Sequence, residues 1–339
     1  MMDQKKEKKV VEEVACWLKL FEDGSVDRTW SGPPEAEFMA KPVPPHEEFI
    51  NGVAIRDITI GAKSGLGVRL YMPERNPNDE EKLPIFVHFH GGGFCISEPE
   101  WFMYYHVYTR LVHSARAICV SVKLRLAPEH RLPAACEDGQ SVLLWLQAVA
   151  LGKLNESWLK ANGDFERVFL IGDSSGGNLV HEVSVRAGFD NLKPIQLAGG
   201  ILINPGFVRV ERSKSELDKK SDSPFLTLEM VDKFLGLALP IGSKKDHPIT
   251  CPMGPAAPPL AGLKLPPFLV AIAENDLILN TEMDYCEAMK KAGKDVEVLV
   301  NVGVGHSFYL NKIAVDTDPQ TVLETNRLIT EIANFIKKH

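Results

Sequence analysis

One serine in this sequence stands where nucleophilic chemistry is expected. An apolar run, 168–171, leads into Gly172-Asp173-Ser174-Ser175-Gly176, and an amphipathic pattern follows. This order predicts a strand, a sharp turn and a helix, with the glycines letting the strand and the helix approach closely. We expect the turn to expose the Ser174 hydroxyl, and the N-terminus of the helix to direct the N–H of Ser175 toward negative charge. A serine held in this way is typical of acyl transfer.

A run of three glycines is the second stretch that could do chemistry. Gly91 to Gly93 directly follow the apolar residues 83–90. Residues without a Cβ atom let backbone N–H groups point at a ligand oxygen, although the same run could form a flexible loop. Because a serine turn follows downstream, we interpret the loop as one side of an oxyanion hole. Gly92 and Gly93 are the favoured donors, Gly91 is a further candidate, and the N–H of Ser175 completes the set.

A reactive serine needs a histidine as its base, and the histidine needs an acid that holds its tautomer. On a strand–turn–helix scaffold the acid and then the histidine follow the serine along the chain. The strand expected at 267–273 leads into Glu274-Asn275-Asp276, and we predict Asp276 as the acid because it stands further out on the loop, with Glu274 as the alternative. His306, in a glycine-containing loop after the strand expected at 296–302, is the predicted base.

Two histidines near the glycine run, His88 and His90, have the spacing that places both side chains on one face of a strand. No third ligand in a typical metal arrangement is near them in the sequence. There is also no Gly-x-Gly-x-x-Gly motif after a strand and no Walker phosphate loop. We therefore expect no metal and no cofactor.

The composition is that of an ordinary folded chain. Of 339 residues, 45% are hydrophobic and 24% are charged, so we expect residues 1–339 to form one large α/β domain with an insertion. The formal net charge is −7, and the lysines and arginines are spread along the chain. This pattern argues against nucleic acid or an anionic membrane as a partner and favours a small neutral or apolar ligand. A monomer or a weak homodimer is expected.

Cysteine usage and the first residues bear on the cellular compartment. The six cysteines show no Cys-x-x-Cys motif and no short-range pairing, which favours reduced thiols. Residues 1–9 are charged, and neither a signal-peptide core nor a membrane-spanning run follows. A cytoplasmic protein is expected.

Hydrophobic periodicity predicts alternating strands and helices around a parallel sheet. Further strands are expected at 53–60, 67–71, 117–122 and 197–203, and helices at 135–151, 281–291 and 321–337. Residues 10–21 carry apolar side chains at helical spacing before Asp23-Gly24, which predicts an amphipathic helix. With the proline-rich arm that follows, this helix would make residues 1–48 part of a lid.

Residues 207–264 interrupt the alternation between two core strands. An insertion of this kind usually forms a cap, and loops on a rigid scaffold set specificity. Aromatic side chains are the candidates for lining a substrate pocket, although each could instead pack the cap on the core. The candidates are Phe94, Phe207, Phe225, Phe234 and Phe308.

Five motifs occur in an order that resembles the hormone-sensitive-lipase-like branch of the α/β hydrolases and, more narrowly, the plant carboxylesterases. They are His90-Gly91-Gly92-Gly93-Phe94, Arg125-Leu126-Ala127-Pro128-Glu129, Gly172-Asp173-Ser174-Ser175-Gly176-Gly177-Asn178, Asp276, and Gly305-His306-Ser307-Phe308-Tyr309. The resemblance implies an α/β-hydrolase fold: a mostly parallel central sheet flanked by helices, with a cap formed by the N-terminal segment and the insertion. It also implies a triad of Ser174, Asp276 and His306 in a serine carboxylesterase for short-chain acyl or small aromatic or specialised-metabolite esters.

The same family includes gibberellin receptors that lost the catalytic histidine, a dehydratase of hydroxyisoflavanones and cyclases of alkaloid biosynthesis. The presence of His306 argues against a receptor, whereas a lyase or cyclase reaction would use the same groups and stays open. Two positions depart from the family pattern: Lys123-Leu124, where an aromatic pair often precedes Arg125, and Asn280, where an aspartate is common. Both departures leave the catalytic groups in place and bear on the substrate.

Overall fold

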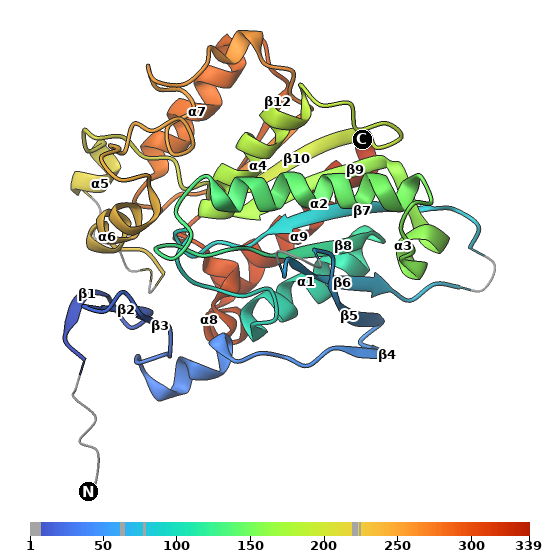
Figure 1. Cartoon of the computed structure of the whole chain (residues 1–339), viewed down its shortest axis with the longest axis horizontal. Helices are drawn as coiled ribbons and strands as arrows, with labels where there is room; N and C mark the ends of the chain where they lie inside the picture. The colour runs from blue at the N-terminus through green and yellow to red at the C-terminus, as the bar shows by residue number, and fades with distance from the viewer. Residues whose placement is uncertain (1–7, 62–64, 77–78, 219–222, 224) are drawn as a thin grey trace, which may run out of the picture.

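The computed structural model describes residues 8–61, 65–76, 79–218, 223 and 225–339. Within these residues the main sheet has the strand order β12-β11-β10-β9-β7-β8-β6-β5-β4 (Figure 1). Its strands are β4 (His46–Ile50), β5 (Val53–Thr59), β6 (Gly67–Pro73), β7 (Leu83–Phe89), β8 (Ile118–Lys123), β9 (Gly163–Asp173), β10 (Leu197–Ile203), β11 (Phe268–Ala273) and β12 (Val296–Asn301). From β8 to β12 neighbouring strands are parallel, whereas β6, β5 and β4 pair antiparallel. The sheet is therefore mostly parallel, as expected.

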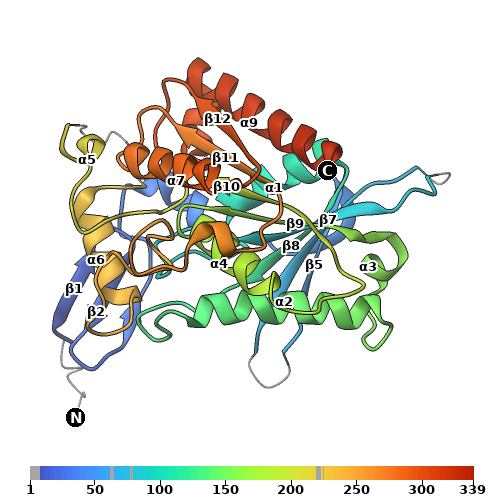
Figure 2. The ribbon, with the colours of Figure 1, turned by 90° about the horizontal axis from the view of Figure 1, so that it is seen from above.

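Helices cover both faces of this sheet. Figure 2 shows α1 (Phe102–Ala115) and α9 (Pro319–Lys338) on one side of the strands and α2 (Ala134–Ala150) and α4 (Ser175–Ala187) on the other. Because both faces are covered, the central strands are apolar, and every residue of β7 and β11 is buried. The remaining described helices are α3 (Ser157–Asn162), α5 (Lys214–Asp218), α6 (Leu228–Ala238), α7 (Leu279–Lys291), α8 (Lys312–Thr317) and the short 3-10 turns η1 (Pro34–Ala40), η2 (Leu260–Gly262) and η3 (Phe308–Leu310).

The helix α1 has no clear signal in the sequence. Aromatic and β-branched residues, which are weak helix formers, make up most of its first two turns. Trp101 at its N-cap makes no capping side-chain hydrogen bond. Most of its residues are buried, and it packs against α9 and the strands. Tertiary packing, rather than local preference, stabilises this helix.

The prediction of a helix over residues 10–21 is wrong. Val10–Val14 (β1) and Leu18–Phe21 (β2) pair as antiparallel strands, and a third short strand, β3 (Val26–Asp27), pairs with β2. The chain reverses at Ala15, whose φ is +45°, and the Trp17 N–H donates to the Val14 carbonyl at 3.0 Å. The valines of β1 favour extended backbone because they are branched at Cβ. The reversal also buries the Trp17 side chain against the rest of the molecule.

The N-terminal sheet is fastened on two sides. Lys233 on α6 donates to the Glu13 carbonyl at 2.7 Å, and Figures 1 and 2 show β1 beside α6. Arg28 donates to both carboxylate oxygens of Glu129, at 2.8 and 2.6 Å, and to the Cys95 carbonyl at 2.6 Å. The N-terminal segment thus contacts both the insertion between β10 and β11 and the loop that follows β7.

The parallel strands determine where the loops with chemical groups meet. β7, β9, β11 and β12 run in the same direction. The glycine run follows β7, Ser174 follows β9, and the loops with Asp276 and His306 follow β11 and β12. Since the carboxyl ends of parallel strands share one edge, the fold brings these four loops together, which is where open α/β sheets bind their ligands.

The buried histidine on α4 predicts a stability that depends on pH. The Nδ1 atom of His181 lies 2.9 Å from the Tyr285 hydroxyl, and burial lowers the pKa of His181 to about 4. As the pH falls, His181 therefore binds a proton in the unfolded chain before it does so in the folded chain. The free energy of unfolding consequently falls as the pH drops from about 6.5 toward 4. The variant His181→Gln lacks this titrating group. The difference in the free energy of unfolding between this variant and the wild type should therefore change by about 2–3 kcal/mol between pH 7 and pH 4.

Urea unfolding followed by tryptophan fluorescence at both pH values measures this change. His113→Gln is the control, because His113 is exposed on α1. This variant measures the effect of replacing a histidine at the surface, and the change in His181→Gln should exceed it. An equal pH dependence in His181→Gln and the wild type would contradict the prediction.

Candidate active site

Ser174 lies at the sharp turn between β9 and α4. Its backbone angles, φ +51° and ψ −121°, are rarely adopted by a residue with a side chain. A Cβ atom on Gly176 would stand 2.0 Å from the Phe89 carbonyl oxygen, and one on Gly172 would stand 2.3 Å from the Gly176 oxygen. Glycine at both positions therefore lets α4 cross the ends of β7 and β9 closely, and the packing around the turn maintains the strained serine.

His306 links the serine to the loop after β11. Its Nε2 atom lies 3.0 Å from Ser174 Oγ, and its Nδ1 atom lies 2.6 Å from Asp276 Oδ2. The other oxygen of Asp276 accepts the Ile278 N–H at 3.1 Å, which fixes the orientation of the carboxylate. Both Asp276 and His306 are buried. The serine, histidine and acid expected from the sequence thus form one continuous chain of hydrogen bonds.

The second carboxylate of this loop, Glu274, has a different environment. It is exposed, and its Oε2 atom accepts the Gly303 N–H at 2.8 Å. This hydrogen bond ties the loop after β11 to the loop that carries His306. Glu274 supports the relative position of the two loops, whereas Asp276 is the carboxylate that His306 contacts.

The glycine loop lies against the N-terminus of α4. The Phe94 N–H donates to Ser175 Oγ at 3.2 Å. Gly92 and Gly93 have positive φ angles, +98° and +59°, that favour glycine. In the described part of the chain the N–H groups of Gly92, Gly93 and Ser175 make no hydrogen bond, and all three residues line the cavity beside Ser174. These three donors are available to a ligand oxygen.

Gly91 departs from the expectation that it is an oxyanion donor. Its N–H donates to the Tyr104 hydroxyl at 3.1 Å and to Asp173 Oδ2 at 3.2 Å. A Cβ atom at this position would stand 2.5 Å from the same Asp173 oxygen. The start of the glycine loop is therefore pressed onto the residue that precedes Ser174. Gly91 anchors the loop, and its N–H is already used.

A buried polar network surrounds this anchor. The Nε2 atom of His88 lies 3.4 Å from Asp173 Oδ1, and its Nδ1 atom lies 2.7 Å from Ser121 Oγ. Burial lowers the pKa of His88, so its ring is neutral at physiological pH. Burial also raises the pKa of Tyr104 well above its ordinary value, so the phenol keeps its proton. Neutral partners thus hold the Asp173 carboxylate and, through it, the glycine loop.

A cavity of about 80 Å³ opens beside Ser174 and His306. Its walls are mainly apolar and come from the N-terminal sheet, the glycine loop, α1 and the insertion. They include Trp17, Phe94, Met103, Phe225, Val231, Phe234 and Leu235. Of the five aromatic candidates, Phe94, Phe225 and Phe234 are on this wall, and the described lining contains no lysine or arginine. The cavity is suited to an uncharged, apolar group.

Phe207 and Phe308 do not line this cavity. Phe207 is fully buried, and its ring centroid lies 4.3 Å from that of Tyr285 on α7. Phe308 packs edge-to-face against Tyr309, with ring centroids 5.4 Å apart. Both stand next to cavity residues in the chain, but the backbone turns their side chains into the core. Proximity in sequence to the site does not determine the direction of a side chain.

Two aromatic residues of the wall are not found by motif reasoning. Trp17 is placed there by the turn between β1 and β2, which the helical pattern of residues 10–21 conceals. Its ring stacks on Trp101 at 6.1 Å and lies 6.3 Å from Phe225. Tyr104 lies on α1, and the available signal is a cluster of tyrosines in an apolar stretch after the glycine loop.

The described residues contain neither a metal-binding cluster nor a membrane-spanning helix. Among them, no three His, Cys, Asp or Glu side chains are grouped so that they could hold a metal ion. His90 lies with Nδ1 2.9 Å from the Gly91 carbonyl, and burial lowers its pKa to about 4. No helix of the described chain has the length and apolar character needed to cross a bilayer.

Comparison with known families matches residues 86–310 to a family with the α/β-hydrolase fold. This range contains Ser174, Asp276, His306 and the glycine loop. The chain belongs to the α/β-hydrolase family. Gibberellin receptor GID1C of Arabidopsis thaliana is 38% identical over 288 residues, 81% of this chain and 80% of the receptor. Probable carboxylesterase 6 of the same plant is 34% identical over 303 residues, 89% of this chain and 85% of that protein.

Solved structures show the same relationship. An esterase from Pyrobaculum calidifontis superimposes on this α/β hydrolase with a TM-score of 0.67 and 28% sequence identity, covering 84% of each chain. This chain therefore shares its overall fold with a known esterase.

The positions of the phenylalanines predict different stabilities in this α/β hydrolase. Phe207→Ala should lower the free energy of unfolding by about 3–5 kcal/mol, because it removes a fully buried ring. Phe225→Ala should lower the free energy of unfolding clearly less, since that ring is half-buried on the cavity wall. Urea unfolding of both variants measures the difference. Equal losses of stability in the two variants would contradict the prediction.

Proposed function

We propose that this chain is a serine carboxylesterase that hydrolyses short-chain acyl esters, or esters of small aromatic and specialised metabolites, through an acyl-serine intermediate. The observation that carries the proposal is the continuous hydrogen-bonded chain from Ser174 through His306 to Asp276 at the base of an apolar cavity. The chain is a carboxylic ester hydrolase by family, since its relatives and structural neighbours include carboxylesterases and esterases.

The geometry supports acylation of the serine. Ser174 Oγ attacks the ester carbonyl carbon while His306 Nε2 takes the hydroxyl proton. The carbonyl electron pair moves onto the oxygen, which accepts hydrogen bonds from Gly92, Gly93 and Ser175. When that pair returns, the bond to the alcohol oxygen breaks, and His306 gives its proton to the departing alcohol. Asp276 keeps Nδ1–H of His306 in place throughout.

Deacylation repeats these steps with water. His306 takes a proton from a water molecule, whose oxygen attacks the acyl carbon of the intermediate. The same backbone donors stabilise the second oxyanion. Its collapse breaks the bond to Ser174 Oγ, which recovers its proton from His306, and the carboxylic acid leaves. The reaction consumes one ester and one water and produces one acid and one alcohol.

The cavity wall limits the substrate class. Apolar side chains from the insertion and the N-terminal sheet surround the reacting serine, and the described lining holds no cationic side chain to pair with a substrate carboxylate. Burial of an unpaired charge is costly. Uncharged acyl groups are therefore favoured over acyl groups that carry a carboxylate.

Hydrolysis is favoured over a pure receptor role. One relative is a gibberellin receptor, and Trp17 from the N-terminal sheet closes one side of the cavity here. A binding site, however, has no need for a histidine that hydrogen-bonds both a strained serine and a buried acid. A lyase or cyclase reaction would use His306 as base without acylating Ser174. Trapping an acyl group on Ser174 separates hydrolysis from both alternatives.

The proposal includes a cytoplasmic location. All six cysteines are free, and five of them are buried. Free thiols are typical of reducing compartments. Imaging of the full chain fused to a fluorescent protein tests this part of the proposal independently of activity.

Ser174→Ala should remove the activity. With a chromogenic acetyl or butyryl ester, kcat should fall by about three orders of magnitude or more, because the nucleophile is lost while the fold is kept. An uncharged organophosphate should add to the wild type and not to the variant by intact-mass spectrometry. Ser184→Ala is the control, since Ser184 is a buried serine of the same helix outside the cavity lining. An unchanged rate in Ser174→Ala would refute the proposal.

The two carboxylates after β11 should respond differently. Asp276→Asn should lower kcat by about 10³ to 10⁴, because an amide favours the wrong tautomer of His306. Glu274→Gln should have a much smaller effect, since the Glu274 side chain bonds the Gly303 N–H at the surface. Steady-state kinetics of the folded variants give the comparison. A larger loss in Glu274→Gln would show that the acid has been assigned to the wrong residue.

A further inference from the structure

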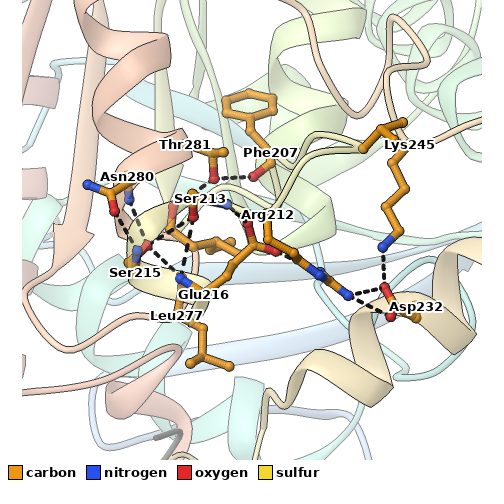
Figure 3. Close-up of polar contacts among 12 residues, drawn as sticks. Phe207, Arg212, Ser213, Ser215, Glu216, Asp232, Lys245, Leu277, Asn280 and Thr281 are labelled. Atoms are coloured by element: carbon orange, nitrogen blue, oxygen red, sulfur yellow. Dashed lines mark hydrogen bonds and ion pairs between the residues drawn. The ribbon is translucent and has the colours of Figure 1, made fainter. Parts of the chain in front are cut away.

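The short helix α5 lies outside the cavity lining but contacts the loop that carries Asp276. Ser215 on this helix is buried, and its Oγ–H donates to the Leu277 carbonyl at 2.7 Å (Figure 3). The Leu277 carbonyl and the Ile278 N–H belong to the same planar peptide group. That N–H donates to Asp276 Oδ1 at 3.1 Å. A single rigid peptide therefore lies between the Ser215 hydroxyl and the acid that contacts His306.

Asn280 fixes Ser215 in turn. The Ser215 N–H donates to Asn280 Oδ1 at 2.6 Å, and the Asn280 N–H donates to Ser215 Oγ at 3.1 Å. An aspartate at this position would offer the same acceptor with a negative charge near Asp276. The amide oxygen of Asn280 makes the bond without that charge. Asparagine at position 280 thus makes the contact between α5 and the loop that carries Asp276.

Polar contacts also hold α5 against the rest of the insertion. Glu216 is buried and accepts the Ser213 N–H at 2.8 Å and an Arg212 N–H at 2.6 Å. Arg212 also donates to both oxygens of Asp232 on α6, at 2.6 and 2.5 Å, and Lys245 pairs with the same carboxylate (Figure 3). Since α6 also supplies part of the cavity wall, polar contacts run from that wall to the acid loop.

The insertion contacts the loop that carries His306 as well as the loop that carries Asp276. Ser223 Oγ donates to the His306 carbonyl at 3.0 Å. The loops that carry Asp276 and His306 are therefore supported from the insertion as well as from the sheet.

We propose that Ser215 is a positioning residue for Asp276 and acts through the Leu277–Ile278 peptide. This inference rests on the proposed function, because the position of Asp276 has a kinetic consequence only in a working triad. Without the Ser215 hydroxyl, the Leu277 carbonyl loses this donor and the peptide is free to rotate. The Ile278 N–H then leaves Asp276, and the carboxylate orients His306 less well. Ser215 itself does not line the cavity, so we expect substrate binding to be retained.

The test compares Ser215→Ala with Ser215→Thr, which restores a hydroxyl at the same position. In Ser215→Ala, kcat for a chromogenic acetyl ester should fall about tenfold, the size expected for one hydrogen bond, with KM unchanged. The rate of organophosphate addition to Ser174 should fall by the same factor. The far-downfield proton resonance of the His306 Nδ1–H should shift or broaden in Ser215→Ala. Ser215→Thr should recover all three properties.

Thr250→Val is the matched control. Thr250 is fully buried in the same insertion, and its hydroxyl donates to the Lys245 and His247 carbonyls within that segment. If kcat falls only because the insertion is less stable, kcat should also fall in Thr250→Val. Equal losses in Thr250→Val and Ser215→Ala, or wild-type kcat in Ser215→Ala, would overturn the proposal. If Ser215→Ala does not fold, Asn280→Ala tests the same link, because it removes the acceptor of the Ser215 N–H.

Failure of the proposed function would be distinguishable from failure of this inference. If the wild type neither hydrolyses esters nor reacts with the organophosphate, ester hydrolysis is wrong. The Nδ1–H resonance still reports the contact between His306 and Asp276 in that case. An unchanged resonance in Ser215→Ala would then overturn the positioning role by itself.

Discussion

The close crossing of α4 over the ends of β7 and β9 is the constraint on which the site depends. Without Cβ atoms at Gly172 and Gly176, the backbones approach closely enough to hold Ser174 at a φ of +51°. That angle is unfavourable by itself, and the buried strands around the turn maintain it. The free N–H of Ser175 and the position of Ser174 on the cavity wall both follow from this crossing. The other groups of the site are arranged around it.

Two buried carboxylates position different parts of the site. Asp173 accepts the Gly91 N–H and thereby sets the glycine loop relative to the serine. Asp276 accepts the Ile278 N–H and holds His306. Each is buried and hydrogen-bonded, as a buried carboxylate must be if the fold is to be stable. One acid therefore positions the glycine loop, and the other positions His306.

The segments that shape the cavity also support the reacting groups. Trp17 reaches the wall from the N-terminal sheet, which Lys233 of α6 and the contacts of Arg28 hold in place. The insertion supplies Phe225 and Phe234 to the wall and also contacts the loops of Asp276 and His306. The same segments therefore shape the cavity wall and contact the loops that carry Asp276 and His306.

Local patterns in the sequence determined the central strands, the serine turn and the residues of the triad, because a strand–turn–helix motif and strand-end loops constrain their neighbours directly. They did not determine the direction of Phe207, the partner of the Gly91 N–H or the extended form of residues 10–21. Those features depend on contacts between segments far apart in the chain: Phe207 with Tyr285, Gly91 with Asp173 and Tyr104, and Trp17 with Trp101. Only tertiary packing decides between two local structures when the same apolar spacing fits both, because the buried surface that selects one of them is supplied by distant residues.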